Sequence, residues 1–72
     1  MDRLDMLRTF VAVADKASFA EAARQLNVSS ATRAVSSLEE MLSATLMRRS
    51  TRSIRLTDGG AIYLERCRAI LR

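Results

Sequence analysis

Apolar residues recur at the spacing of a helix face in four segments of this chain. Each segment follows the i, i+3, i+4, i+7 pattern of an amphipathic helix. The positions are Leu7, Phe10, Val11 and Ala14 within residues 3–15; Phe19, Ala22, Ala23 and Leu26; Ala31, Ala34 or Val35, Leu38 and Met41 or Leu42; and Gly60, Tyr63, Leu64, Cys67 and Ile70 or Leu71. The pattern predicts a mainly α-helical fold with four helices.

Hydroxyl side chains stand before the last three helical segments. Ser18 with Glu21 has the form of a capping box, in which the serine binds a backbone N–H and the glutamate reaches back. Ser29 or Ser30 can cap the third helix, and Thr57 can cap the fourth. The second and third helices are therefore short and closely joined, as in a helix-turn-helix.

The spacing changes to two between residues 46 and 56. Residues 53–56 alternate polar and apolar side chains, which is typical of a strand. Together with residues 46–49 they predict a two-stranded hairpin with its tip at residues 50–52. The fold class is then a winged helix-turn-helix, three helices plus a two-stranded β-wing, followed by a further helix.

Charge is segregated along the 72 residues, whose formal net charge is +4. Residues 22–38 and 41–57 contain no acid but hold six of the twelve basic residues, namely Arg24, Arg33, Arg48, Arg49, Arg52 and Arg55. Arginine favours bidentate contacts to phosphate and guanine. A solvated basic face is the simpler explanation of a charge run alone. The helix-turn-helix that these arginines flank favours double-stranded DNA as the partner.

Several function classes lack the residues that they need. The chain has no histidine and one cysteine, Cys67, which excludes histidine-based catalysis, typical zinc sites and an internal disulfide. A lone thiol suits a reducing cytoplasm. The longest apolar run, residues 10–14, is too short to span a membrane. We expect no cofactor, no metal, no membrane association and no enzymatic activity.

The motifs, taken in order, resemble the N-terminal winged helix-turn-helix domain of LysR-type bacterial transcriptional regulators. They are L-x-x-F-V-A-V-A-D (residues 7–15), S-F-A-E-A-A-x-x-L (18–26), N-V-S (27–29), R-A-V-x-x-L-E-x-x-L (33–42) and L-M-R-R-x-T-R-x-I-x-L-T-D-G-G (46–60). The resemblance covers nearly the whole chain. It implies sequence-specific operator binding by residues 1–57 and the start of a linker and dimerisation helix in residues 58–72.

The resemblance also implies partners and missing parts. Regulators of this type are cytoplasmic homodimers whose dimers often pair into tetramers, and a C-terminal domain senses a small-molecule inducer. We expect that domain to be absent from this sequence, which stops within a helical pattern. The apolar stripe of the last helix has no later partner in the chain, which predicts dimerisation through Tyr63, Leu64, Cys67, Ile70 and Leu71.

The same resemblance implies the DNA contacts. The third helix enters the major groove, the hairpin tip reaches the minor groove, and the start of the second helix faces phosphate. The DNA-binding residues expected on this basis are Ser18, Ser29, Ser30, Thr32, Arg33, Ser36, Arg49 and Arg52. Capping alone is an equally good reading of Ser29 and Ser30, and Arg33 could pair with a helix carboxylate instead.

Two departures from the family pattern stand out. Ser43 occupies the place where a glycine usually ends the third helix. The family also has about two more residues between the N-V-S turn and Arg33. Either the helix begins later, with residues 29–32 as its cap, or two residues are missing near Thr32 and Arg33, which is the alternative that we favour. The second alternative predicts a Cα separation between Thr32 and Arg33 clearly longer than about 3.8 Å.

Two other functions compete with DNA binding. A small helical protein-interaction module with a solvated basic face would show no steep salt dependence with duplex DNA. An RNA-binding domain is disfavoured because aromatic residues make up only 4% of the chain, without a stacking cluster.

Overall fold

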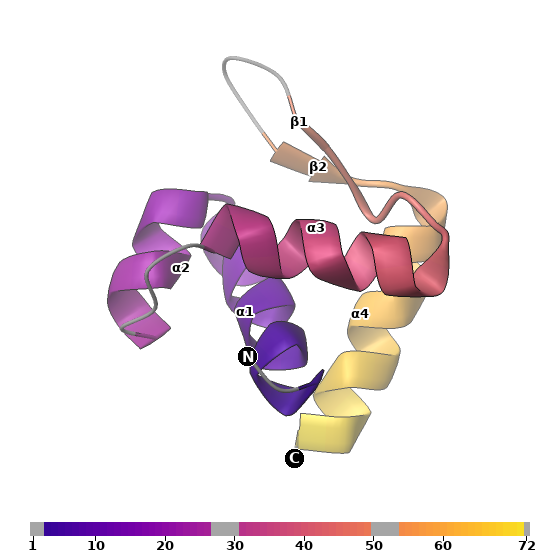
Figure 1. Ribbon diagram of the computed structural model, residues 1–72, viewed down its shortest axis with the longest axis horizontal. Coiled ribbons are helices and arrows are strands. Elements are labelled where there is room, and N and C mark those ends of the chain that lie inside the picture. The colour runs from indigo at the N-terminus through magenta and orange to yellow at the C-terminus, as the bar shows by residue number, and fades with distance from the viewer. Residues whose placement is uncertain (1–2, 27–30, 50–53, 72) are drawn as a thin grey trace.

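A computed structural model describes residues 3–26, 31–49 and 54–71, without the side chains of residues 23, 25, 26 and 49. The elements are α1 (Arg3–Lys16), α2 (Phe19–Leu26), α3 (Ala31–Leu42), β1 (Met47–Arg49), β2 (Ile54–Leu56) and α4 (Asp58–Leu71). Figure 1 shows α1 among the other helices, with α2 on one side, α4 on the other and the hairpin at the end opposite both termini. This arrangement confirms the winged helix-turn-helix fold.

The core forms around α1, which packs against each of the other three helices. Leu7 and Phe10 are buried as the apolar spacing predicts, whereas Val11 and Ala14 are only half-buried. Val13 and Thr9, outside the predicted stripe, are fully buried. A single stripe underestimates the burial of a helix that has neighbours on several sides. The Thr9 hydroxyl is satisfied within the helix, where it donates to the Asp5 carbonyl at 2.7 Å.

The serine half of the capping box expected at Ser18 and the cap expected at Thr57 are present, whereas the Glu21 carboxylate pairs with Arg24. The Ser18 Oγ accepts from the Glu21 backbone N–H at 3.2 Å, and the Thr57 Oγ1 accepts from the Gly60 N–H at 3.0 Å. Each satisfies a donor that the first turn of a helix leaves without a partner. Ser29 and Ser30, the cap candidates of α3, lie outside the described residues.

The third helix is shorter than the family pattern but unbroken. It runs from Ala31 to Leu42, so Thr32 and Arg33 are consecutive residues of its first turn. The alternative in which the helix starts after Thr32 is therefore wrong. The absence of two residues near Thr32 and Arg33, relative to the family, stays a prediction. Ala31, Ala34, Val35 and Leu38 are all buried, which explains how a shorter helix keeps one apolar face. Met41 and Leu42, expected to continue that face, are exposed instead.

The end of α3 adopts the backbone geometry that normally favours glycine. Ser43 has φ = 52°, in the left-handed region. Its N–H donates to the Glu40 carbonyl at 3.1 Å, and the Ala44 N–H donates to the Glu39 carbonyl at 3.1 Å. These are the two hydrogen bonds of a Schellman motif. The motif therefore forms without glycine and retains the steric cost of a Cβ in this region.

Candidate nucleic-acid interface

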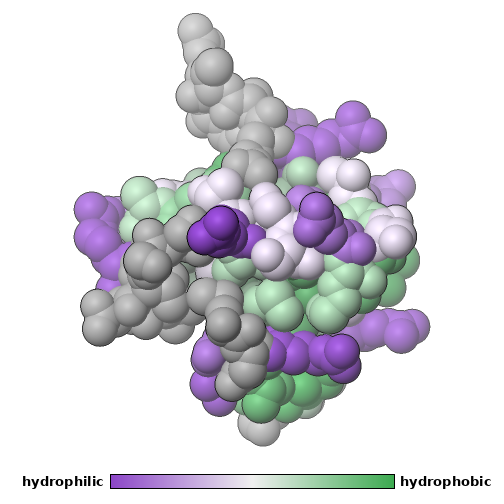
Figure 2. Space-filling model, viewed as in Figure 1, coloured by the Kyte–Doolittle hydropathy of each residue, from purple (hydrophilic) through white to green (hydrophobic). Residues whose placement is uncertain are grey.

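The outward face of α3 is polar and free of acids over its first two turns. Thr32, Arg33 and Ser37 are exposed and Ser36 is half-buried, while the opposite face lies in the core. In Figure 2 the surface over α3 is pale to purple, with apolar surface along its lower edge. Glu40, the first exposed acid on this face, follows one turn after Ser36. A short polar face with one basic side chain, Arg33, suits insertion between the phosphate backbones of a DNA groove.

The start of α2 places Ser18 at a helix N-terminus. Its hydroxyl serves as the N-cap, and its carbonyl accepts from the Ala22 N–H at 3.2 Å. Glu21, the acid of the first turn, forms an ion pair with Arg24 three residues later. That pair neutralises the acid beside the cap, so the positive end of the helix dipole is offset less by Glu21.

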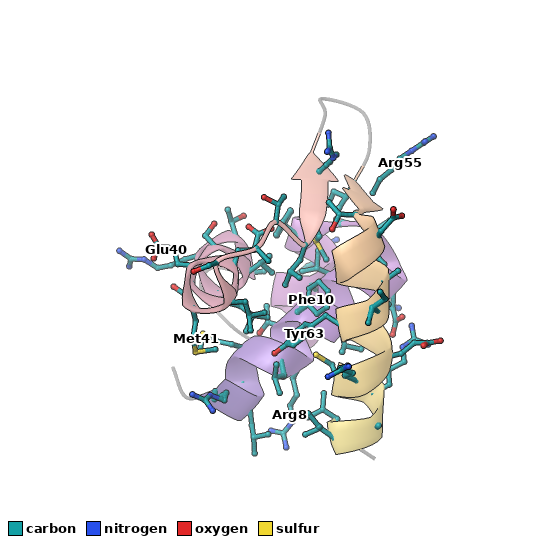
Figure 3. All side chains as sticks on the ribbon, turned by 90° about the vertical axis from the view of Figure 1, so that its right-hand side faces the viewer. Arg8, Phe10, Glu40, Met41, Arg55 and Tyr63 are labelled. Carbon is teal, nitrogen blue, oxygen red and sulfur yellow. The ribbon has the colours of Figure 1, made fainter. Side chains whose placement is uncertain are left out.

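The hairpin exposes arginine on the face away from the core. β1 and β2 are antiparallel, with Met47 opposite Leu56 and Arg48 opposite Arg55. Met47 is buried in the core, whereas both arginines of the next pair are exposed. In Figure 3 Arg55 points away from the helices, on the side opposite Glu40 and Met41 of α3. Like charges directly opposite each other repel, so an anion bound between them would stabilise the hairpin.

The structure describes some of the expected DNA-binding residues and not others. It brings Thr32, Arg33 and Ser36 together on one helix and places Ser18 at the start of another. Arg49 lies in β1 opposite Ile54, but its side chain is outside the description. Ser29, Ser30 and Arg52 also lie outside the described residues. Within the described part, no group of acidic or thiol side chains could hold a metal, and no helix is long and apolar enough to cross a membrane.

The stripe expected to dimerise has a partner inside its own chain. Cys67 is 0% exposed, and Tyr63, Leu64 and Leu71 pack against the core. The Tyr63 ring lies 5.9 Å from the ring of Phe10, centroid to centroid (Figure 3). The premise that nothing in the chain covers this stripe is therefore wrong, because α1 covers it. Burial raises the pKa of the Cys67 thiol and of the Tyr63 hydroxyl.

The exposed apolar side chains of α4 lie on other faces. Ile62 is 60% exposed and Ile70, the one expected dimer residue that remains largely open, is 59% exposed. Ile62 was missed because it falls outside the i, i+3, i+4 series that starts at Gly60. Its spacing of seven from Ala69 and eight from Ile70 is the signal that could have found it.

Comparison with known proteins places this geometry in a family. Residues 4–61 match the bacterial regulatory helix-turn-helix proteins of the lysR family. The HTH-type transcriptional activator AaeR of Escherichia coli (strain K12) is 48% identical over 73 residues, which cover 99% of this chain and 24% of AaeR. An HTH-type transcriptional repressor of Pseudomonas aeruginosa (strain UCBPP-PA14) is 40% identical over 99% of this chain and 23% of that protein. The chain thus spans about a quarter of the length of these relatives.

Solved structures show the same fold. The DNA-binding domain of CbnR in complex with DNA superposes with a TM-score of 0.91 at 40% identity, over 97% of this chain and 83% of that chain. The BenM DNA-binding domain with catB site 1 DNA gives 0.90 at 32% identity, over 97% and 81%. The chain therefore belongs to the lysR family of bacterial regulatory helix-turn-helix proteins and forms the family's winged helix-turn-helix DNA-binding domain.

Proposed function

We propose that this chain recognises the operator of a transcriptional regulator, with α3 in the major groove and the hairpin beside the minor groove. The observation that carries the proposal is the acid-free outer face of α3, on a fold that matches two DNA-binding domains solved with DNA. Residues 1–57 form the DNA-binding unit, and residues 58–72 begin the linker helix. Relatives named as an activator and as a repressor support either direction of regulation.

Each DNA-binding residue has a role in this proposal. Arg33 reads a base or a phosphate, because it is exposed in the first turn of α3. Thr32 and Ser36 contact phosphate or base edges beside it. The helix dipole at Ser18 attracts phosphate. The remaining contacts come from Ser29 and Ser30 before α3, and from Arg49 and Arg52 in the hairpin, where a narrow minor groove attracts arginine.

The test is binding to a duplex selected by the protein from a randomised pool. With four to six phosphate contacts per protomer, the log–log plot of affinity against salt should fall by about 0.9 per contact. Arg33→Ala should weaken binding by about 1–3 kcal/mol. Arg8→Ala is the matched control: Arg8 is exposed on α1, pairs with Asp5 at 3.8 Å and lies far from the hairpin in Figure 3. Affinity insensitive to salt would instead favour a protein-interaction module.

Because α1 covers much of the apolar stripe of α4, we propose a different centre for the dimer contact. The open apolar positions of α4, Ile62 and Ile70, become the core of a two-fold contact, and Tyr63, Leu64, Cys67 and Leu71 support it from beneath. A two-fold axis matches a palindromic operator. We further infer a cytoplasmic homodimer, able to form a tetramer in the full-length regulator, without enzymatic activity. The inducer would bind an effector domain in the part of the longer relatives that this chain does not cover.

A further inference from the structure

The base of the hairpin is bound to the end of α3 by one carboxylate. Glu39 Oε2 accepts from the Leu46 N–H at 2.7 Å and from the Met47 N–H at 3.2 Å. Leu46 immediately precedes β1, and Met47 is its first residue. Hydrogen bonds to a charged acceptor are about twice as strong as neutral ones. Glu39 therefore joins the last turns of α3 directly to the first strand of the hairpin.

Thr57, which precedes α4, binds the same two peptide groups on either side of Leu46 through their carbonyl oxygens. The Thr57 N–H donates to the Leu46 carbonyl at 3.0 Å, and the Thr57 Oγ1 donates to the Thr45 carbonyl at 2.6 Å. Gly60 lies so close that a Cβ there would be 2.0 Å from the Leu46 oxygen. The Leu46 peptide is thus held between α3 and α4, with its side chain buried.

The hairpin depends on such contacts for its position. Its strands are three residues each, and an isolated two-stranded hairpin is marginally stable at best. Met47 of β1 is buried in the core and Ile54 and Leu56 of β2 pack against it, while Glu39 supplies the hydrogen bonds that join the start of β1 to α3. Without that carboxylate, two backbone N–H groups at the start of β1 lose their acceptor.

We propose that Glu39 is a positioning residue for DNA binding, which holds the hairpin at a fixed distance and angle from α3. The inference rests on the proposed function, since it concerns how two DNA-contacting elements are kept in register. Both elements can engage one duplex only if their separation matches that of adjacent grooves. A hairpin free to move gives up its phosphate contacts or orders itself on binding, and either lowers affinity.

Charge repulsion alone predicts the opposite result, namely that removal of the Glu39 side chain strengthens DNA binding. Glu39 is negative, half-buried and near a surface proposed to bind polyanionic DNA, so its loss as a charge should strengthen binding. Glu40 provides the matched control, because it is the same residue type one position later in α3, and it is exposed. Its backbone carbonyl accepts from the Ser43 N–H, and truncation of the side chain leaves that hydrogen bond in place.

The experiment compares Glu39→Ala with Glu40→Ala on a duplex selected from a randomised pool by the wild-type protein. We expect Glu39→Ala to bind about tenfold more weakly, and its salt slope to be shallower by about one phosphate contact. Glu40→Ala should bind as tightly as wild type or more tightly, with an unchanged slope. A partly unfolded protein lowers the active fraction but leaves the slope of the folded fraction unchanged, so the slope separates positioning from stability.

Wild-type affinity and slope in a folded Glu39→Ala protein would overturn the inference, as would identical changes in the two variants. If Glu39→Ala does not fold, Glu39→Gln and Glu40→Gln replace the pair, because a neutral amide is a weaker acceptor of the same length. Weaker binding by Glu39→Gln alone supports the inference, and equal binding contradicts it. Failure of the wild-type protein to bind any duplex would refute the proposed function itself.

Discussion

Substitution of two adjacent glycines by alanine should change stability in opposite directions. Gly59 and Gly60 both lie in the first turn of α4. A Cβ at Gly60 would meet the Leu46 carbonyl oxygen at 2.0 Å and its carbon at 2.9 Å. A Cβ at Gly59 has its nearest neighbour, the Thr57 hydroxyl, at 3.9 Å, which is ordinary contact. The two sites share the same helical turn and differ in the room that each leaves for a Cβ atom.

The size of the effect at Gly60 follows from that clash. An ordinary carbon–oxygen contact is about 3.3 Å or longer, so α4 and Leu46 must separate by about 1.3 Å. This separation would break the hydrogen bond from Thr57 N to Leu46 O, now 3.0 Å long. Overpacking costs about 1–3 kcal/mol, and the lost bond costs about 1 kcal/mol. The better helix propensity of alanine offsets about 0.5–1 kcal/mol. The net loss is about 1–3.5 kcal/mol.

At Gly59 only the favourable effect remains, about 0.5–1 kcal/mol. In a domain of this size 1 kcal/mol corresponds to about 4–8 °C in Tm. Thermal denaturation followed by circular dichroism, at one fixed protein concentration, should therefore place Gly60→Ala about 5–25 °C below wild type and Gly59→Ala a few degrees above it. Equal Tm values for the two variants would refute the close approach of α4 to Leu46.

Three further changes test other features of the fold. Ser43→Gly should raise stability by about 0.5–1 kcal/mol, because removal of a Cβ from the left-handed region outweighs the added entropy of the unfolded chain. The control, Ser37→Gly within α3, should lower stability. A lower Tm for both variants would contradict this reasoning. Burial raises the pKa of Cys67 above 9.0, so the unfolded thiol ionises first and stability should fall as pH rises above 9.0. The native thiol should also resist thiol reagents until denaturant is added, and rapid labelling of the native protein would argue against burial. Ile62→Glu with Ile70→Glu should shift sedimentation equilibrium toward monomer, and Met41→Glu, an exposed apolar site on α3, should not.

Local signals predicted the elements well because caps and periodicity act over a few residues. The hydroxyls of Ser18 and Thr57 mark helix starts, and the alternation at residues 53–56 marks a strand. The start of α3 was misplaced in the alternative that began the helix after Thr32, although Ala31, Val35 and Leu38 share one apolar face.

Contacts between distant residues were harder to predict. A helical stripe shows that a face is buried but not what buries it, and so Cys67 was assigned to a partner chain when α1 covers it. Val13 was missed because α1 has more than one buried face. The Glu39 contact joins a side chain to backbone N–H groups seven and eight residues away, and backbone donors carry no sequence signal. Of the candidate interface, the polar face of α3 was predictable, since it depends on one helix.

The packing of Cys67 and Leu71 with the core bears on how domains of this family could be exchanged between regulators. The family match ends at residue 61, but the hydrophobic core continues through Tyr63, Cys67 and Leu71. A chimera joined at residue 61 would bring foreign side chains against Phe10. A fusion joined after Leu71 would keep Tyr63, Cys67 and Leu71 with the rest of the described core, and the packing against Phe10 would be carried into the new protein together with the DNA-binding face.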